Sequence, residues 1–220
     1  MLKPIRKERL LRDLLVIELG LGLYGLAIAM MIRANLGTSA WSVLDVALSQ
    51  HLGVTPGTMT VSIGFLVLSG ALILKEQIGW GTLANILSIG PWEDLFLRLI
   101  PPVRGNLLLQ SALLLSGIAL IGLASAIYIG VDAGAGPRDT LMLAFKRKFG
   151  WSVRLARGTI EAVVITLGWL LGGPVGIGTL AYVLLIGPMV QAGFKLLHVE
   201  PHKNLPPAGP AAVEALKAGD

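Results

Sequence analysis

Six long apolar runs, separated by shorter polar or glycine-rich segments, fill most of the sequence between residues 14 and 194. A bilayer core about 30 Å thick is crossed by roughly 20 apolar residues in a helix. The second and fifth runs are shorter than this and need flanking residues to cross. The predicted spans are Leu14–Ile32, Met59–Leu74, Thr82–Ile100, Leu107–Val131, Thr159–Leu171 and Val175–Phe194. Because hydrocarbon tolerates only structures that pair their own backbone groups, the pattern predicts an all-α, polytopic transmembrane helix bundle.

The first span has a second interpretation, because basic residues precede it and residues 27–29 resemble a signal-peptidase site. Two observations favour a retained helix. Glu18 interrupts the apolar stretch, and the same Gly/Ala pattern recurs at residues 117–126, where no signal peptidase acts. We therefore expect the first span to remain in the protein.

The two halves of the sequence match each other without a gap at a constant offset of 97 residues. The most specific match is a Gly-x-Gly-Thr motif, formed by Gly79, Gly81 and Thr82 in one copy and by Gly176, Gly178 and Thr179 in the other. We predict repeat A over residues 14–100 and repeat B over residues 101–197. A basic cytoplasmic N-terminus (residues 1–13) precedes them, and a disordered cytoplasmic tail (residues 198–220) follows.

Each predicted repeat holds three spans, so the second must cross the membrane upside down relative to the first, giving a 3+3 inverted-topology repeat. The positive charges fit this topology, since basic residues gather on the cytoplasmic side. With the N-terminus inside, 15 of the 18 Lys and Arg residues lie inside, and Arg33, Arg98 and Arg104 lie outside. The linker at 35–57 has no Lys or Arg, whereas its counterpart at 132–157 has six. We expect a multi-pass protein of the bacterial plasma membrane with both termini cytoplasmic.

Each repeat contains a short linker helix after its first span. In the first, Thr38 or Ser39 is the expected N-cap and Gly53 the expected stop. Such a helix either lies flat on the membrane surface, which the basic run at 146–148 favours, or dips into the protein as a re-entrant half-helix. If both dip, their N-termini meet near the centre and attract an anionic or polar group. The ligand-binding candidates on the linkers are Trp41, Asp45, Gly134, Gly136, Arg138 and Asp139.

Ionisable residues inside the bilayer are further candidates, because burying a charge there is costly. Glu161 ranks first, with Arg157 four residues earlier as a purely structural partner. Glu93 and Asp94 either line a cavity or mark a helix end. The Gly-x-Gly-Thr motifs either expose unwound backbone to a ligand or form tight turns that begin a helix, and we favour the turns.

Composition narrows the functional classes. With 54% hydrophobic and 14% charged residues, the chain does not resemble a water-soluble enzyme. It has no cysteine, which excludes disulfides, thiol catalysis and Cys-based zinc sites. The net charge of +5 follows the membrane topology, so a nucleic-acid partner is not expected. No catalytic, cofactor or metal motif is present, and we expect no enzymatic activity.

Gly168 and Gly172 have the spacing of a helix-packing face, within the monomer or in an oligomer.

The linker motifs also carry a family resemblance. Residues 35–44, residues 134–139 and the Gly-rich segment 168–179 together resemble the bacterial YczE/YyaS/YitT family of integral membrane proteins, over about Leu14–Leu197. Ala40 stands where that family often has proline, and Ser42 where it often has aspartate. The resemblance implies a polytopic plasma-membrane protein and supplies no substrate or catalytic residues.

These observations lead to two functional hypotheses. The first is a transporter or channel-like protein that handles a small polar or anionic solute between its two halves, with the lipid bilayer as its environment. The alternative is a non-transporting membrane scaffold or accessory protein, in which the basic linker segment at 146–148 recruits a cytoplasmic partner or lipid.

Overall fold

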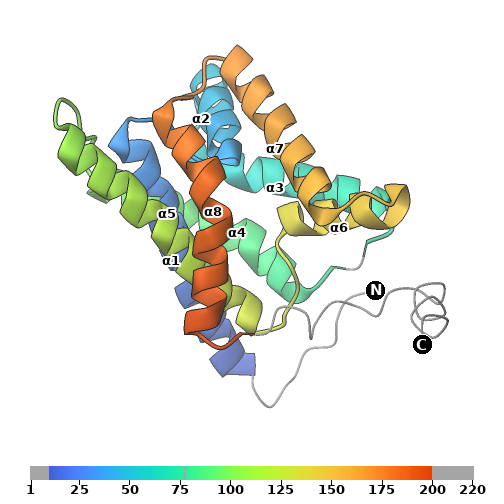
Figure 1. Cartoon of the computed structure of the whole chain (residues 1–220). Coiled ribbons are helices and arrows are strands. Elements are labelled where there is room, and N and C mark those ends of the chain that lie inside the picture. Colours follow the sequence, from blue (N-terminus) through green and yellow to red (C-terminus); the bar gives the residue numbers. More distant parts are fainter. Residues whose placement is uncertain (1–9, 77, 200–220) are drawn as a thin grey trace.

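The computed structural model describes residues 10–76 and 78–199, and within them all regular structure is helical (Figure 1). The predicted N-terminal segment up to residue 9 and the predicted tail from residue 200 lie outside the described residues. Eight helices follow in chain order: α1 (Leu10–Ala34), α2 (Ala40–Leu52), α3 (Pro56–Ile73), α4 (Trp80–Leu99), α5 (Leu107–Gly130), α6 (Pro137–Phe149), α7 (Val153–Leu170) and α8 (Ile177–Leu196). The all-α prediction is confirmed for this part of the chain.

Local sequence signals set the ends of the short helices. The Ser39 side chain accepts a hydrogen bond from the Ser42 backbone N–H and so caps the start of α2. Gly53 ends α2 and Gly150 ends α6, each with a φ of 68°, a left-handed conformation that glycine adopts more easily than other residues. The predicted stop at Gly53 and the Ser39 alternative for the N-cap are confirmed.

The helix bounds recur along the chain. α2 and α6 both have 13 residues, α3 and α7 both have 18, and α4 and α8 both have 20. Each pair begins and ends at positions that differ by 97, the offset of the sequence match. α5 likewise begins 97 residues after α1. The duplication seen in the sequence is therefore matched by a duplication of helix lengths and connections.

The two halves also contact each other reciprocally. α2 packs against α7 and α3 against α6, while α1 and α5 run side by side in opposite directions (Figure 1). The backbone N–H of Gly81 donates to the Ala133 carbonyl at 2.9 Å, and Gly178 donates to the Leu36 carbonyl at 2.7 Å. In these two bonds the donor of each half pairs with an acceptor of the other half, and the two donors and the two acceptors are equivalent at the offset of 97.

Four helices are long and apolar enough to cross a membrane. Their candidate spans are Leu11–Ala34, Pro56–Ile73, Leu107–Gly130 and Ile177–Leu196. Two further predicted spans correspond to α4 and α7, which carry charged residues such as Glu93 and Glu161. α7 begins six residues before the apolar run predicted there, because the Ser152 side chain caps it.

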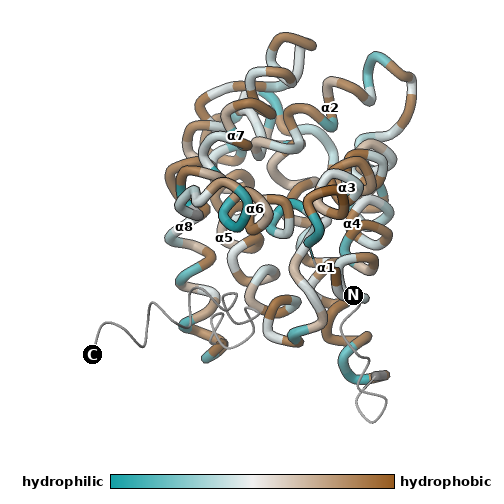
Figure 2. Tube along the Cα trace, turned by 90° about the vertical axis from the view of Figure 1, so that its right-hand side faces the viewer, coloured by the Kyte–Doolittle hydropathy of each residue, from teal (hydrophilic) through white to brown (hydrophobic). Residues whose placement is uncertain are grey.

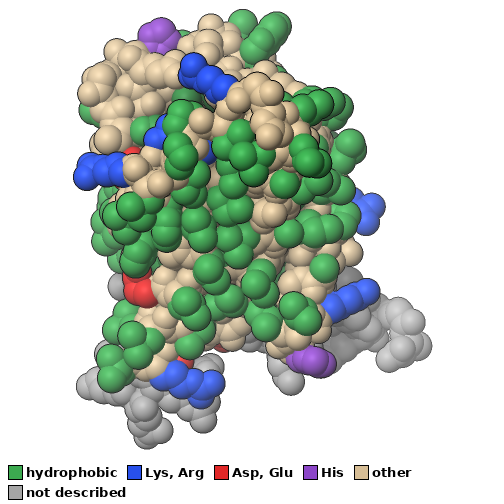
Figure 3. Space-filling view, turned by 90° about the vertical axis from the view of Figure 1, so that its left-hand side faces the viewer, with side chains coloured by type: hydrophobic (Ala, Val, Ile, Leu, Met, Phe, Trp, Pro, Cys, Tyr) green, Lys and Arg blue, Asp and Glu red, His purple; other side chains and the backbone are tan. Residues whose placement is uncertain are grey.

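The outer surface has the character expected of a membrane protein. On the face shown in Figure 3, hydrophobic side chains cover most of the middle, and basic side chains and histidines lie mainly toward the two ends. Large exposed hydrophobic residues include Leu108, Ile73 and Leu184. The trace in Figure 2 is hydrophilic along α6, in contrast to the apolar helices around it. Lipid is the natural solvent for such an apolar surface.

Glycines let the central helices approach closely. A Cβ added at Gly25 of α1 would lie 2.7 Å from Trp92 Cβ on α4, and one at the equivalent Gly122 of α5 would lie 2.4 Å from the Met189 carbonyl oxygen on α8. Gly168 packs in the same way against Leu44 of α2, so this part of the predicted glycine face serves packing within the monomer.

Candidate functional site

Both linker helices begin inside the protein and end at its surface. The first residues of α2, from Ala40 to Val43, are buried, whereas Leu52 at its end is 63% exposed. In α6, Pro137 is buried and residues 146–149 are exposed. This burial pattern favours the dipping arrangement over a helix that lies flat on the surface along its whole length.

The first turns of both short helices border one central cavity of about 80 Å³, through Trp41 of α2 and residues 137–139 of α6, and all eight helices contribute lining residues. One water needs about 10–15 Å³, so the space is sufficient for a small solute of a few heavy atoms. Four pairs of lining residues are equivalent at the offset of 97: Trp41 and Arg138, Thr60 and Arg157, Gly64 and Glu161, and Asn85 and Tyr182. The cavity therefore lies where the two halves meet.

Arg138 is the central charged group. Its guanidinium lies 3.2 Å from Asp45 Oδ2 and stacks over the Trp41 ring, 4.7 Å from the ring centroid. The Arg138 side chain is 23% exposed, whereas that of Asp45 is 1% exposed. The ion pair thus has one end in the protein interior and the other end at the cavity.

Asp45 and Glu93 are linked through one hydroxyl. Thr60 Oγ1 lies 3.1 Å from Asp45 Oδ2 and 2.8 Å from Glu93 Oε2. Both carboxyl groups are fully buried. Asp45 and Glu93, which lie 48 positions apart in the sequence, are therefore brought together by α2 and α4 behind Thr60 of α3, which does line the cavity.

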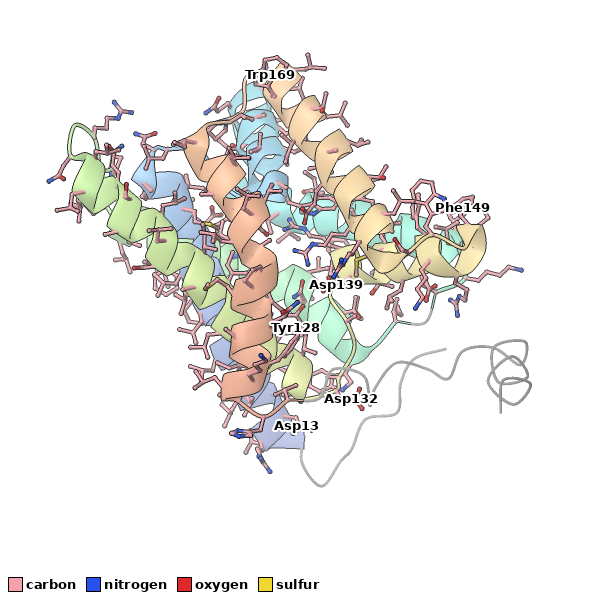
Figure 4. The ribbon with its side chains drawn as sticks, in the orientation of Figure 1. Asp13, Tyr128, Asp132, Asp139, Phe149 and Trp169 are labelled. Atoms are coloured by element: carbon pink, nitrogen blue, oxygen red, sulfur yellow. The ribbon has the colours of Figure 1, made fainter. Side chains whose placement is uncertain are left out.

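The other side of the cavity holds two more polar pairs. The Tyr128 hydroxyl donates to Asp139 Oδ2 at 3.2 Å, and Figure 4 shows these two residues near each other at the centre of the molecule. Arg157 donates to Glu161 Oε1 at 2.9 Å, so the structural pairing expected for Glu161 is present. Both Arg157 and Glu161 also line the cavity, and the pair therefore faces any bound solute.

Several predicted residues lie elsewhere. Asp94 accepts a hydrogen bond from the Gly57 backbone N–H at 2.9 Å and from the Thr55 hydroxyl, so it caps the start of α3 and is not at the central cavity. Gly134, with φ of 126°, packs against Gly79, because a Cβ there would lie 2.7 Å from the Gly79 Cα.

The Gly-x-Gly-Thr motifs form helix starts, as favoured above. In each motif the threonine hydroxyl accepts the N–H of the first glycine, at 3.2 Å for Thr82 and 3.3 Å for Thr179. The glycines leave room for the linker loop of the opposite half, since a Cβ at Gly81 would lie 2.8 Å from Ala133 Cβ and one at Gly178 would lie 2.8 Å from the Leu36 carbonyl oxygen. These residues join the halves and do not line the central cavity.

Sequence reasoning missed several lining residues. Thr60, Asn85 and the three tyrosines of the chain all border the cavity: Tyr24, Tyr128 and Tyr182. The tyrosines offered a usable signal. Membrane proteins usually place tyrosine at the ends of their spans, whereas two of these three lie near the middle of a predicted span. Thr60 and Asn85 offered no comparable signal.

Apolar helices that can cross a bilayer, packed around a cavity with buried charged pairs, define a helical membrane protein. The chain matches the model of a family of unknown function, DUF6198, over residues 11–195, and it belongs to that family. It is 32% identical over 160 residues to the uncharacterized membrane protein YczE of Bacillus subtilis (strain 168), covering 71% of this chain and 73% of YczE. An uncharacterized protein of Haemophilus influenzae is 30% identical over 187 residues, 85% of each chain. The uncharacterized protein YyaS of Bacillus subtilis is 31% identical over 177 residues, 79% of this chain and 88% of YyaS. No solved structure matches the chain.

Proposed function

We propose that this protein is a six-span transporter or channel-like protein of the bacterial plasma membrane, which binds a small polar or anionic solute in the cavity between two inverted halves. The spans are α1, α3, α4, α5, α7 and α8, and the re-entrant helices are α2 and α6. α4 and α7 count as spans because their equivalents α8 and α3 have the same lengths and are apolar enough to cross. Both termini lie in the cytoplasm, as the distribution of positive charges indicates.

One observation carries the proposal: the cavity is lined by equivalent positions of both halves, and the first turns of both short helices border it, through Trp41 of α2 and residues 137–139 of α6. Transporters with inverted repeats place their substrate sites at this interface, where broken or half-length helices present free backbone N–H groups. A site that both halves share changes its access when one half moves relative to the other.

The charges in the cavity indicate the kind of solute. Arg138 and Arg157 each face the cavity, and each is paired with a carboxylate of the protein, Asp45 and Glu161 respectively. A carboxylate or phosphate group can replace the protein's own carboxylate as the partner of a guanidinium. Trp41 supplies an apolar wall beside Arg138. A small anion with a polar or short apolar remainder fits this combination.

The experiment is a ligand screen on the purified full-length chain, reading thermal stabilisation with a panel of small anionic and neutral polar metabolites. We expect one or more anions to stabilise the protein. Trp41→Ala and Arg157→Gln should each weaken the binding at least tenfold. The matched controls are Trp169→Ala and Arg154→Gln, because both side chains are exposed on α7 outside the cavity. The controls should bind as the unchanged protein does.

The scaffold alternative has an observation of its own. Phe145, Phe149 and Trp151 form an aromatic cluster with ring centroids 5.4 to 6.0 Å apart, beside the exposed basic run at 146–148. This surface suits the interface of an anionic membrane. If the folded protein neither binds nor passes any member of the panel in vesicles, and the cavity variants behave as the unchanged chain does, the transport proposal is wrong and the scaffold is favoured.

A further inference from the structure

Two carboxyl groups share one hydroxyl behind the cavity wall. Asp45 and Glu93 are each 0% exposed, and both lie within hydrogen-bond distance of Thr60 Oγ1. Their remaining oxygens, Asp45 Oδ1 and Glu93 Oε1, are buried as well, and neither has a hydrogen-bond partner among the described residues. A buried carboxylate without full pairing is expensive, so this arrangement needs a chemical explanation.

The single hydrogen of the Thr60 hydroxyl explains the arrangement. A threonine hydroxyl has one hydrogen, and it can donate that hydrogen to one carboxylate. At the second carboxyl group the hydroxyl oxygen must accept, and an ionised carboxylate has no hydrogen to give. If both groups were ionised, one of the two short oxygen–oxygen contacts would lack a hydrogen, and two like charges would meet in a buried place. A proton on one of the two carboxyl groups satisfies both contacts.

The surrounding charges indicate which group holds the proton. Asp45 is paired with the Arg138 guanidinium at 3.2 Å, which stabilises its ionised form. Glu93 forms no ion pair with a described residue, and its own helix places the acidic Asp94 next to it. α3 carries no charged residue, and Glu18 of α1 accepts hydrogen bonds from Ser88 and Trp92 of α4. The charged residues of α6 near the cavity, Arg138 and Asp139, are engaged by Asp45 and Tyr128.

We propose that Glu93 binds a dissociable proton at neutral pH and donates it to Thr60, which in turn donates to Asp45. Asp45, Thr60 and Glu93 thereby form a proton-binding site next to the cavity. The proton site itself does not depend on the transport proposal. Its link to a solute does rest on that proposed function: an anion that draws Arg138 away from Asp45 leaves Asp45 unpaired, and Asp45 then takes up a second proton.

The direct test is infrared spectroscopy of the full-length protein in vesicles at neutral pH, because a protonated carboxyl group has a carbonyl band that a carboxylate lacks. We expect a band that shifts in D₂O and disappears in Glu93→Gln. Thr60→Val should keep the band and move it to higher frequency, since the acid then loses its hydrogen-bond acceptor. The matched control is Asp94→Asn, which changes the neighbouring carboxyl group and should leave the band in place. Identical spectra for Glu93→Gln and the unchanged chain would overturn the proposal.

A second measurement covers the case in which Glu93→Gln folds poorly. The folded chain holds a proton that the unfolded chain releases at neutral pH, so stability must fall as pH rises. One proton held by the folded chain alone makes the unfolding equilibrium constant rise tenfold per pH unit. Thr60→Val should alter this dependence of stability on pH. A slope of zero between about pH 6 and pH 8 in the unchanged chain would overturn the proposal.

Discussion

Removing Arg138 should destabilise the protein much more than removing the charge of its ion-pair partner, Asp45. The two groups lie 3.2 Å apart, but the Asp45 side chain is 1% exposed and that of Arg138 is 23% exposed. Removing the partner of a buried charge costs about 3–5 kcal/mol, because the remaining charge can neither pair nor reach water. Arg138→Met strands Asp45 in this way, beside Glu93. We expect it to lower the free energy of unfolding by at least about 3 kcal/mol.

Asp45→Asn should cost less. Arg138 then keeps its contact with Trp41 and its opening to the cavity. The new amide still bonds to Thr60, so we expect about 1.5–3 kcal/mol, the contribution of one hydrogen bond to a charged group. The double variant should cost less than the sum of the two single variants.

The assay is equilibrium unfolding of the purified full-length chain in mixed micelles at about pH 8, where protonating a stranded carboxylate is itself costly. Arg154→Met is the control, since Arg154 is exposed and its replacement should change stability by less than about 0.5 kcal/mol. Equal costs for the two single variants, or strictly additive costs in the double variant, would refute the reasoning.

Three further predictions concern the halves and the surface. Single cysteines at Val54 and Trp151, equivalent positions in the two halves, should react with an impermeant reagent from opposite sides of the membrane; reaction from one side would contradict the inverted arrangement. Gly25→Val and Gly122→Val should each lower the free energy of unfolding by about 1–3 kcal/mol, because each added side chain meets a neighbouring helix. Thermal unfolding measures the effect, and no effect at either position would show that the helices can separate. Replacing the basic residues 146–148 with glutamine should weaken binding to vesicles with anionic lipid by about 1 kcal/mol per charge, an effect that high salt should abolish; unchanged binding would remove that surface from consideration.

The sequence was most informative about the helices. Apolar run length located the long helices, and Ser39 and Gly53 located the ends of α2, because span length and capping are local properties. The fifth run was assigned too late a start, because the charged Arg154 and Arg157 interrupt the apolar pattern although the segment is already helical.

The cavity was only partly predictable. Arg138, Asp139 and Glu161 were found because charge inside a membrane protein is conspicuous, and Trp41 because of its place on the linker. Thr60 was missed, since a threonine in an apolar helix looks ordinary until tertiary packing places it between two carboxyl groups. Glu93 and Asp94 were predicted together, but adjacent residues on a helix point in directions about 100° apart. Glu93 contacts Thr60 behind the central cavity, whereas Asp94 caps α3 and borders two outer grooves.

Trp41 and Arg138 occupy the same position in the two halves, and they touch each other. In an assembly of two identical chains, a residue at this position would meet its own copy, so a guanidinium would face a guanidinium or an indole would face an indole. Joining the copies into one polypeptide removes that restriction, and the central contact can then combine a cation with an aromatic face. In the proposed inverted arrangement, a single chain can therefore place a cation against an aromatic ring at this contact, which two identical subunits related by symmetry cannot do.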